Sequence, residues 1–318
     1  MQEYRLTQKL MGTIFTLGVV SSDEVEADML LKLGVQEIER LEGLLSEFRP
    51  DSTTSKINAF ASENWVPADP ETYGLLKRSM AISRLCKGDF DITVAPLKKL
   101  FHFKNTDFEM PGDGDIAAAL EKVGYDRLLF DDASQSVKFA TKGMRISFAA
   151  IGKGFAADRV ITQWKHNGLT SGFVSASGDI RVLGVNSHGA PWKAGIANPD
   201  AIDKTLFQLS LQNNAIATSG NSEQYFVWQN QRWSHNINPH TGKPLQGIKS
   251  VSIISPVAEL SDALATAVYV KGIHKGMEFV DQLPQTHAVI IDEKDKVHFS
   301  KDLAYEIITD PAGADMFK

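Results

Sequence analysis

The chain has 318 residues, of which 43% are hydrophobic and 23% are charged, so it is long enough to bury the core of one large domain or two smaller ones. Its net charge of −6 argues against a broad nucleic-acid-binding surface. The single cysteine, Cys86, excludes disulfide bonds within the chain and leaves thiolate metal clusters unsupported. No run of about 18 apolar residues is present, so the sequence predicts no membrane-spanning helix.

The first part of the chain predicts one strand and two long helices. The strand is expected at 12–20 and an amphipathic helix at 23–45, followed by a polar turn at 46–52. The sequence Asp-Pro-Glu at 69–71 is a favourable helix start, and that helix should run to about Cys86. The residues of the first helix expected to face the core are Val25, Met29, Leu33, Ile38, Leu41 and Leu45.

The rest of the chain alternates between helices and short strands. The next expected elements are an irregular segment at 88–113, a short helix near 114–122, a strand pair near 127–131 and 136–140, and a helix at 154–167 that Gly168 ends. Further strands joined by tight turns are expected at 172–174, 180–185, 192–196 and 206–211, with a last strand pair at 287–291 and 296–299.

This order of elements predicts an α+β fold. Several strands follow one another as hairpins, so we expect a mixed, largely antiparallel sheet core flanked by helices. No internal repeat, low-complexity tract or linker is present, which favours a single domain over residues 1–318, with a two-lobed arrangement also open.

A stretch of small residues at 261–272 predicts a helix that Ser261 begins and Gly272 ends. Asp262 and Thr266 are four residues apart, so they share one face near the start of this helix. Two hard oxygen donors on an alanine-rich face suit a small hard cation such as Mg²⁺. Acidic residues are also favoured in first turns, so a simple capping role for Asp262 stays open.

The segment 149–158 (Ala-Ala-Ile-Gly-Lys-Gly-Phe-Ala-Ala-Asp) carries two glycines around a lysine. Gly152 and Gly154 allow a close backbone approach, helix amides from about Gly154 can receive an anion, and Lys153 adds positive charge there. The segment therefore suits a phosphate, although it lacks both the Walker spacing and the complete dinucleotide fingerprint. A strand-to-helix turn that needs glycine for packing is the alternative.

Two further polar turns follow. Residues 175–179 (Ser-Ala-Ser-Gly-Asp) can bind phosphate or ribose through backbone N–H groups, or serve as turn residues alone. Residues 217–225 combine hydroxyl groups with a glycine, but no nucleophile elbow surrounds their serines.

A loop at 235–242 (His-Asn-Ile-Asn-Pro-His-Thr-Gly) contains two candidate bases. His235 is expected where a strand ends and the loop begins, a common place for a catalytic base, and His240 is the second candidate. Either histidine can equally be an ordinary surface residue.

Together and in this order, the motifs resemble one family, the FAD:protein FMN transferases of the ApbE family. The matching segments are residues 11–15, 47–52 with 57–58, 88–97, 151–158, 177–179, 217–220, 235–242 and 261–267. The resemblance spans roughly residues 10 to 275, and it lies in the combined order and spacing of motifs that are individually weak.

The resemblance implies an enzyme that splits FAD at its pyrophosphate with Mg²⁺, transfers FMN to a Ser or Thr hydroxyl of an acceptor protein, and releases AMP. It implies a flavin site in a cleft between two lobes. Carried over by position, the implied metal ligands are Asp262, Thr266 and the main-chain carbonyl near Ala150, and the implied base is His235. The implied FAD contacts are Met11, Phe48, Lys153, Ser177, Gly178, Asp179, Thr218 and Ser219.

The chain departs from the commoner family pattern at three places. Asn238 stands where relatives usually have Asp, Ala149 and Ala150 replace a frequent glycine pair, and Phe48 replaces a frequent Tyr or Asn. These changes bear on the balance between transfer and hydrolysis. Two alternatives therefore stay open: a Mg²⁺-dependent FAD pyrophosphatase giving FMN and AMP, and a non-catalytic FAD-binding protein.

The resemblance also implies a partner and a location. Acceptors carry a motif of the form Asp-Xaa-Xaa-Ser/Thr-Gly-Ala-Ser/Thr, which this chain lacks, so the acceptor flavoprotein is expected to be a separate protein. Most relatives are exported, so a periplasmic or cell-envelope location is expected.

Overall fold

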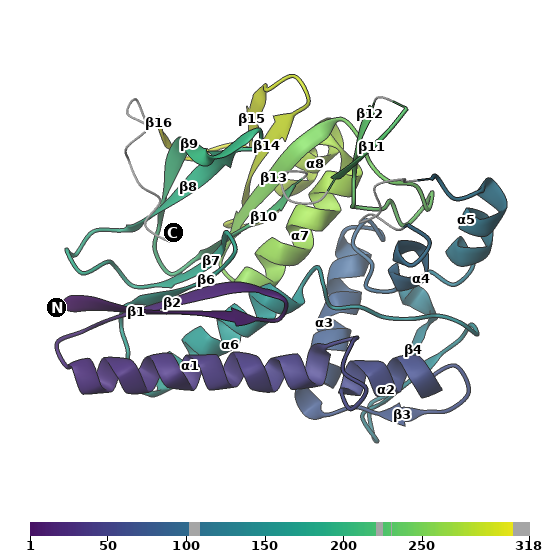
Figure 1. Cartoon of the computed structure of the whole chain (residues 1–318), viewed down its shortest axis with the longest axis horizontal. Coiled ribbons are helices and arrows are strands. Elements are labelled where there is room, and N and C mark those ends of the chain that lie inside the picture. The colour runs from purple at the N-terminus through teal and green to yellow at the C-terminus, as the bar shows by residue number, and fades with distance from the viewer. Residues whose placement is uncertain (102–108, 221–224, 230, 308–318) are drawn as a thin grey trace.

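The computed structural model describes residues 1–101, 109–220, 225–229 and 231–307. Its centre is an eight-stranded sheet with the strand order β1-β2-β6-β7-β10-β13-β14-β15 (Figure 1). Every pairing between its described strands is antiparallel. These strands are β1 (Gln2–Leu10), β2 (Thr13–Ser21), β6 (Gly172–Ala176), β7 (Asp179–Leu183), β10 (Ala215–Gly220), β13 (Ile248–Ser255), β14 (His287–Asp292) and β15 (Val297–Phe299).

Helices cover one face of this sheet. They are α1 (Glu24–Leu45), α6 (Gly152–His166), α7 (Ala258–Lys271) and α8 (Ile273–Val280). Side chains alternate between the two faces of a strand. Val174 on β6 and Leu183 on β7 therefore join the helix-side core, while Phe173 and Val182 face the other way. The same alternation turns Asp179 towards the helices, which matters for the site.

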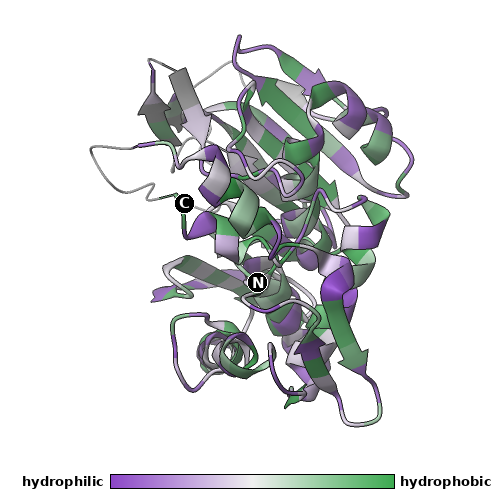
Figure 2. Ribbon diagram, turned by 90° about the vertical axis from the view of Figure 1, so that its right-hand side faces the viewer, coloured by the Kyte–Doolittle hydropathy of each residue, from purple (hydrophilic) through white to green (hydrophobic). Residues whose placement is uncertain are grey.

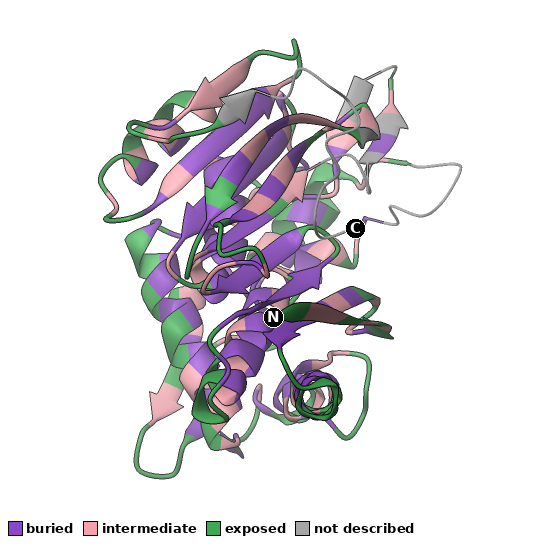
Figure 3. Ribbon diagram, turned by 90° about the vertical axis from the view of Figure 1, so that its left-hand side faces the viewer, coloured by how far each residue is buried: buried purple, intermediate pink, exposed green. Residues whose placement is uncertain are grey.

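A small sheet covers the opposite face. It contains β8 (Trp192–Asn198), β9 (Ala201–Leu211) and β16 (Glu306–Ile307). Trp192 is fully buried and meets Phe173 edge-to-face, with ring centroids 5.2 Å apart. The central sheet is thus buried on both faces, as the ribbon coloured by burial shows (Figure 3).

The remaining elements gather beside the helix layer, on the right of Figure 1. They are α2 (Thr53–Phe60), β3 (Val66–Pro67), α3 (Pro70–Leu85), α4 (Ala95–Lys98), α5 (Asp113–Leu120), the 3₁₀ turn η1 (Tyr125–Arg127), β4 (Leu128–Asp131), β5 (Ser136–Phe139), β11 (Tyr225–Trp228) and β12 (Gln231–Ser234). Strands β3, β5 and β4 form a small sheet, and β11 pairs with β12. Hydrophobic residues line the strands and inner helix faces, while hydrophilic residues mark the loops (Figure 2).

The sequence-based α+β prediction is confirmed, and most element positions agree. Asp69 caps α3 as expected, accepting a hydrogen bond from the Thr72 amide at 2.9 Å. Cys86 is free, as a single cysteine requires, and it is buried. Within the described residues, no helix is long and apolar enough to cross a membrane. The single domain over 1–318 and its two lobes stay predictions.

The sequence analysis gave no range for several elements, among them β1, α2, α8, β10 and β13, and α4 lies in the segment at 88–113 that was expected to be irregular. Strand β1 has largely exposed or partly exposed side chains, so it carries little hydrophobic signal. Helix α2 starts directly after the predicted polar turn, because Ser52 caps it by accepting from the Ser55 amide at 2.9 Å.

The predicted inward face of α1 was wrong at its beginning. Val25 is 79% exposed and Met29 48% exposed. The buried face begins at Ala27 and continues through Leu30, Leu31 and Gly34. The helix lies close to the sheet at Gly34, because a Cβ atom there would lie 2.6 Å from Leu17. Ile38, Leu41 and Leu45 are buried as predicted.

The predicted start of the helix at 261–272 was also wrong. Helix α7 begins at Ala258, three residues earlier, and ends at Gly272 as expected. Its N-terminus is capped from another element, because the Asp158 carboxylate accepts from the Glu259 amide at 2.8 Å. Ser261 is fully buried, and its hydroxyl pairs with that of Ser255 at 2.8 Å.

Candidate functional site

Two hairpin turns lie side by side at one end of the central sheet. Met11 and Gly12 join β1 to β2, and Ser177 and Gly178 join β6 to β7. All four residues have positive φ, at 49°, 78°, 48° and 100° in that order, the geometry of tight two-residue hairpin turns. The Ser177 amide donates to the Ile14 carbonyl at 3.0 Å, so this amide is bound to β2.

A buried charged cluster lies on the helix side of this sheet. The Lys153 ammonium is 3.2 Å from the Asp179 carboxylate and 3.5 Å from the Asp262 carboxylate. The two acidic side chains are only 10% and 7% exposed, and Lys153 is 28% exposed. One cation faces two anions, so the cluster carries an excess negative charge at neutral pH. These three residues come from α6, β7 and α7, and the fold brings them together.

The close approach of α6 and α7 requires glycine at position 154. A Cβ atom there would lie 2.2 Å from the Ala258 carbonyl oxygen. The packing role considered for this glycine is therefore correct. The Gly154 amide also donates to the Asp262 carboxylate at 3.2 Å, so the anion at the start of α6 is the protein's own carboxylate. A phosphate-binding role for the 149–158 segment stays a prediction.

The capping alternative for Asp262 does not hold for its own helix. Asp262 is the fifth residue of α7, beyond the first turn. Its carboxylate instead lies at the N-terminus of α6, where the helix dipole favours negative charge.

The buried cluster shifts the pKa of two of its members. Burial and the neighbouring Asp262 charge raise the pKa of Asp179 to about 6, although Lys153 opposes this effect. Burial disfavours the charge on Lys153, but Asp262 and Asp179 outweigh it and raise the pKa of this lysine above its ordinary value. Lys153 therefore stays protonated at neutral pH.

Strand β10 contributes residues to both faces of the sheet. The Ser219 hydroxyl is 3.4 Å from that of Thr266 on α7, so it belongs to the helix side. The Thr218 hydroxyl instead pairs with that of Ser252 at 2.8 Å, and the alternation of β10 turns it towards the opposite face. Only the main chain of Thr218 joins the cluster, donating to the Asp179 carboxylate at 2.9 Å.

The oxygen donors around Asp262 fit a small hard cation. Asp262 and Thr266 lie one turn apart on α7, and Asp262 is largely buried. Among the described residues, no group donates a hydrogen bond to the Ala150 carbonyl oxygen, because the Gly154 amide that would ordinarily reach it is bound to Asp262. A carboxylate, a hydroxyl and an unpaired carbonyl are ligands that Mg²⁺ accepts. In the described part of the chain, no group of three His, Cys, Asp or Glu side chains is placed to hold a metal, so water or a substrate would complete the coordination of a cation here.

The loop at 235–242 is fixed by its own hydrogen bonds. His235 directly follows β12, as predicted, and is partly buried. The Asn238 side chain accepts from the His240 amide at 2.8 Å and its carbonyl accepts from Gly242 at the same distance. The turn expected from Asn-Pro is therefore formed.

The two candidate histidines differ in their surroundings. The His240 ring lies 3.0 Å from the Asp89 carboxylate, which also binds Lys271. This contact ties the loop to the segment that follows α3 and, through Lys271, to α7, so His240 helps to hold the loop in place. His235 is left as the candidate base.

Phe48 is the most exposed of the expected flavin contacts. Its side chain is 87% exposed, while its neighbour Glu47 accepts a hydrogen bond from the Ser147 hydroxyl at 2.7 Å. Ser147 lies five residues before α6, the helix that carries Lys153. The hydrogen bond between Ser147 and Glu47 therefore ties the loop of Phe48 to the segment that leads into α6. Met11 is also near α6, since a Cβ atom on Gly152 would lie 3.7 Å from its methyl carbon.

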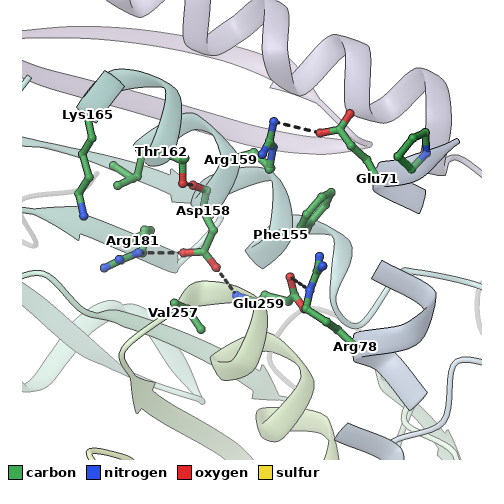
Figure 4. Close-up of a pocket in the computed structure, with 12 residues that line it drawn as sticks. Glu71, Arg78, Phe155, Asp158, Arg159, Thr162, Lys165, Arg181, Val257 and Glu259 are labelled. Carbon is green, nitrogen blue, oxygen red and sulfur yellow. Dashed lines mark hydrogen bonds and ion pairs between the residues drawn. The ribbon is translucent and has the colours of Figure 1, made fainter. Parts of the chain in front are cut away.

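A cavity of about 670 Å³ lies on the other side of α6, between α3, β7 and the start of α7 (Figure 4). Three arginine–carboxylate pairs line it. Arg181 binds Asp158 at 2.8 Å, Arg78 binds Glu259 at 2.7 Å and Arg159 binds Glu71 at 3.1 Å. Asp158 stands between Arg181 and the amide end of α7 in Figure 4. Asp158 of α6 accepts from the amide end of α7, so this network holds the two helices together. The same packing places Lys153 of α6 beside Asp262 of α7.

The fold and the buried cluster define an α+β protein with a charged site at one end of an antiparallel sheet. The ApbE family model matches residues 11–291. The structure resembles the ApbE protein from Thermotoga maritima, at 31% identity and a TM-score of 0.87, covering 94% of this chain and 97% of that one. It also resembles the flavin transferase ApbE from Vibrio cholerae, at 25% identity and a TM-score of 0.83, covering 94% and 97%.

A curated relative agrees with these structures. The FAD:protein FMN transferase from Klebsiella pneumoniae is 27% identical over 316 residues, covering 96% of this chain and 97% of its own length. The chain belongs to the ApbE family.

The sequence analysis missed the roles of two side chains that shape this site. Asp158 ends the recognised 149–158 motif, but its capping of α7 was not predicted. Glu47 gave no separate signal, because its partner Ser147 lies on a distant segment of the chain.

Proposed function

We propose that this protein transfers FMN from FAD to a Ser or Thr hydroxyl of a separate acceptor protein in a Mg²⁺-dependent reaction that releases AMP. Membership of the ApbE family and relatives named FAD:protein FMN transferase support the transferase activity. The observation that carries the metal requirement is the buried cluster of one lysine and two carboxylates, with an excess negative charge beside an unpaired carbonyl.

In the proposed site, Asp262, Thr266 and the Ala150 carbonyl hold the cation. A bound Mg²⁺ supplies charge neutralisation at the phosphates of FAD, where negative oxygens surround the attacked phosphorus. Without it, the Asp262 carboxylate would repel the pyrophosphate. Lys153 stays protonated between Asp179 and Asp262 and contributes a fixed positive charge to the same place.

His235 takes the proton from the acceptor hydroxyl. The hydroxyl oxygen then forms a bond to the phosphorus of the FMN half, the bond to the AMP oxygen breaks, and AMP leaves with the electron pair. Proton transfer by a positioned histidine typically contributes about 10²–10⁴-fold to a rate. Met11 and Phe48 contact the flavin ring, and the 177–179 turn with Thr218 and Ser219 lines the nucleotide pocket.

The test is incubation of the protein with FAD, Mg²⁺ and an acceptor protein that carries the Ser/Thr motif, read by mass spectrometry. We expect a covalent FMN adduct on the acceptor and AMP in solution. Asp262→Ala should lose the adduct, as should chelation of Mg²⁺. Stoichiometric AMP and free FMN with an unlabelled acceptor would instead identify a pyrophosphatase, and intact FAD after prolonged incubation would identify a carrier.

We further propose that the protein works in the periplasm or cell envelope, because most members of the family are exported. Fractionation of the source cells, with detection of this chain, tests that location.

A further inference from the structure

The loop that carries His235 is a hairpin with hydrogen bonds between its two arms. The Ser234 amide donates to the Leu245 carbonyl at 2.9 Å, and the Leu245 amide donates to the Asn236 carbonyl at 3.1 Å. The main chain is therefore bound on both sides of His235. Further pairing between the arms continues towards the tip at 239–242. Because the arms are bound to each other along their length, the orientation of the tip sets that of His235.

Two different contacts hold the tip of this hairpin. One is apolar, since a Cβ atom on Gly242 would lie 2.7 Å from the Ile116 side chain of α5 and 3.0 Å from the Leu97 side chain of α4. The other is polar, since the His240 ring lies 3.0 Å from the Asp89 carboxylate. An apolar contact is non-directional, whereas a hydrogen bond restricts both a distance and an angle. The contact with Asp89 therefore fixes the orientation of the tip.

Asp89 is itself bound to the helix that carries Asp262. The Lys271 ammonium, at the end of α7, donates to the Asp89 carboxylate and, at 2.9 Å, to the Cys86 carbonyl. The side chains of Asp89 and Lys271 are only 14% and 13% exposed. Each oxygen of Asp89 thus has its own partner, one on α7 and one on the hairpin. Asp262 lies nine residues before Lys271 on the same helix, about 14 Å along its axis.

The surroundings of the His240 ring decide which of its atoms is the donor. The Asp89 carboxylate is paired with Lys271 and can only accept, so Nε2 of His240 carries the proton and donates it to this bond. The ring also packs against the main chain, because a Cβ atom on Gly88 would lie 3.2 Å from its Cε1 atom. The His240 side chain is still 51% exposed, so a substitution there leaves the buried pair of Asp89 and Lys271 intact.

We propose that Asp89 and His240 are positioning residues of the transfer reaction. Their hydrogen bond sets the hairpin of His235 against α7, the helix of the proposed cation ligands. This inference rests on the proposed function, because it concerns the base of that same reaction. Misplacing a reacting group by about 1 Å can cost about 10²-fold in rate, so the contact acts on the rate of transfer and not on FAD binding.

The test compares three variants in FMN transfer to an acceptor protein that carries the Ser/Thr motif. His240→Leu removes the donor, His240→Gln restores an N–H donor of similar reach, and His274→Leu is a control at an exposed histidine of α8. His240→Leu should lower kcat by about 10–100-fold, with KM for FAD within about twofold of the wild-type value. His240→Gln should recover most of the lost kcat, and His274→Leu should match the wild type.

Two further readouts separate positioning from other roles. Free imidazole should restore transfer in His235→Ala, which lacks the base, but not in His240→Leu, in which the base is present and displaced. The Gly242 amide donates to the Asn238 carbonyl at 2.8 Å within the tip. Its hydrogen exchange should be faster in His240→Leu than in the wild type and in His240→Gln, while the amides of α7 keep their protection.

Three results would overturn the assignment: a wild-type kcat in His240→Leu, a His240→Gln variant as slow as His240→Leu, or imidazole rescue of His240→Leu, which would make His240 the base. If the wild type labels its acceptor in these cases, the transferase proposal stands. If the wild type forms no adduct, the transferase proposal fails and the role in transfer fails with it. The Gly242 exchange then still reports on the hydrogen bond itself, and unchanged exchange in His240→Leu would show that Asp89 does not hold the tip.

Discussion

Replacing Gly154 with alanine tests how α6 and α7 build the site. The new Cβ atom would lie 2.2 Å from the Ala258 carbonyl oxygen and 2.8 Å from the Glu259 nitrogen, so the start of α7 must move by more than 1 Å. Overpacking of this kind costs about 1–3 kcal/mol, while alanine gains roughly 1 kcal/mol in helix propensity. The displaced α7 would also weaken the hydrogen bond from Gly154 to Asp262. These two effects leave a net loss of about 0–2 kcal/mol, to which the weakened hydrogen bond adds, and we expect a large loss of transfer activity.

Two other glycines serve as controls. A Cβ atom on Gly43 of α1 would meet no atom within 4 Å, so Gly43→Ala should stabilise the protein by about 0.5–1 kcal/mol. A Cβ atom on Gly152 would make ordinary contacts at 3.6 Å and 3.7 Å, so Gly152→Ala should leave stability nearly unchanged. Urea unfolding measures all three variants. Gly154→Ala with the stability of Gly152→Ala and normal acceptor labelling would refute the reasoning.

Three further variants test other parts of the account. His235→Gln should lower FMN transfer by about 10²–10⁴-fold while Mg²⁺ binding by calorimetry persists, and unchanged transfer kinetics would remove His235 from the mechanism. Asp158→Asn should destabilise the protein by about 3 kcal/mol in urea unfolding, because it leaves the buried Arg181 charge unpaired; a cost below 1 kcal/mol would contradict the capping network. Folding raises the pKa of Asp179 to about 6. Between pH of about 4 and about 6, the folded metal-free wild type therefore keeps this proton longer than the unfolded chain does, and its free energy of unfolding falls as the pH rises. The stability advantage of Asp179→Asn should therefore grow over that range by on the order of 2–3 kcal/mol and then level off, and a pH-independent difference would count against the buried charge.

The sequence predicted elements well where local signals act alone. The Asp-Pro-Glu start of α3, the period-two strands and the glycine that ends α7 all depend on residues close in the chain. The start of α7 depends on Asp158, which lies about 100 residues earlier, so no nearby residue revealed it.

The sequence predicted which residues belong to the site, but it did not predict most of the contacts that these residues make. The order of motifs selected Lys153, Asp179 and Asp262, and the fold brings these three together. The partners of Gly154 and Thr218 were not predictable from the sequence. The Gly154 amide donates to the Asp262 carboxylate of α7. The Thr218 hydroxyl is turned to the opposite face of the sheet by strand alternation, where it pairs with Ser252.

The most direct test of the central claim is a crystal structure of the protein with FAD and Mn²⁺, with the cation located by its anomalous signal. We expect the ion to be bound by the Asp262 carboxylate, the Thr266 hydroxyl and the Ala150 carbonyl, at roughly 2.0–2.3 Å, and to contact the pyrophosphate of FAD. A bound FAD whose phosphates carry no cation, or a cation that lies away from Asp262 and Thr266, would contradict the account.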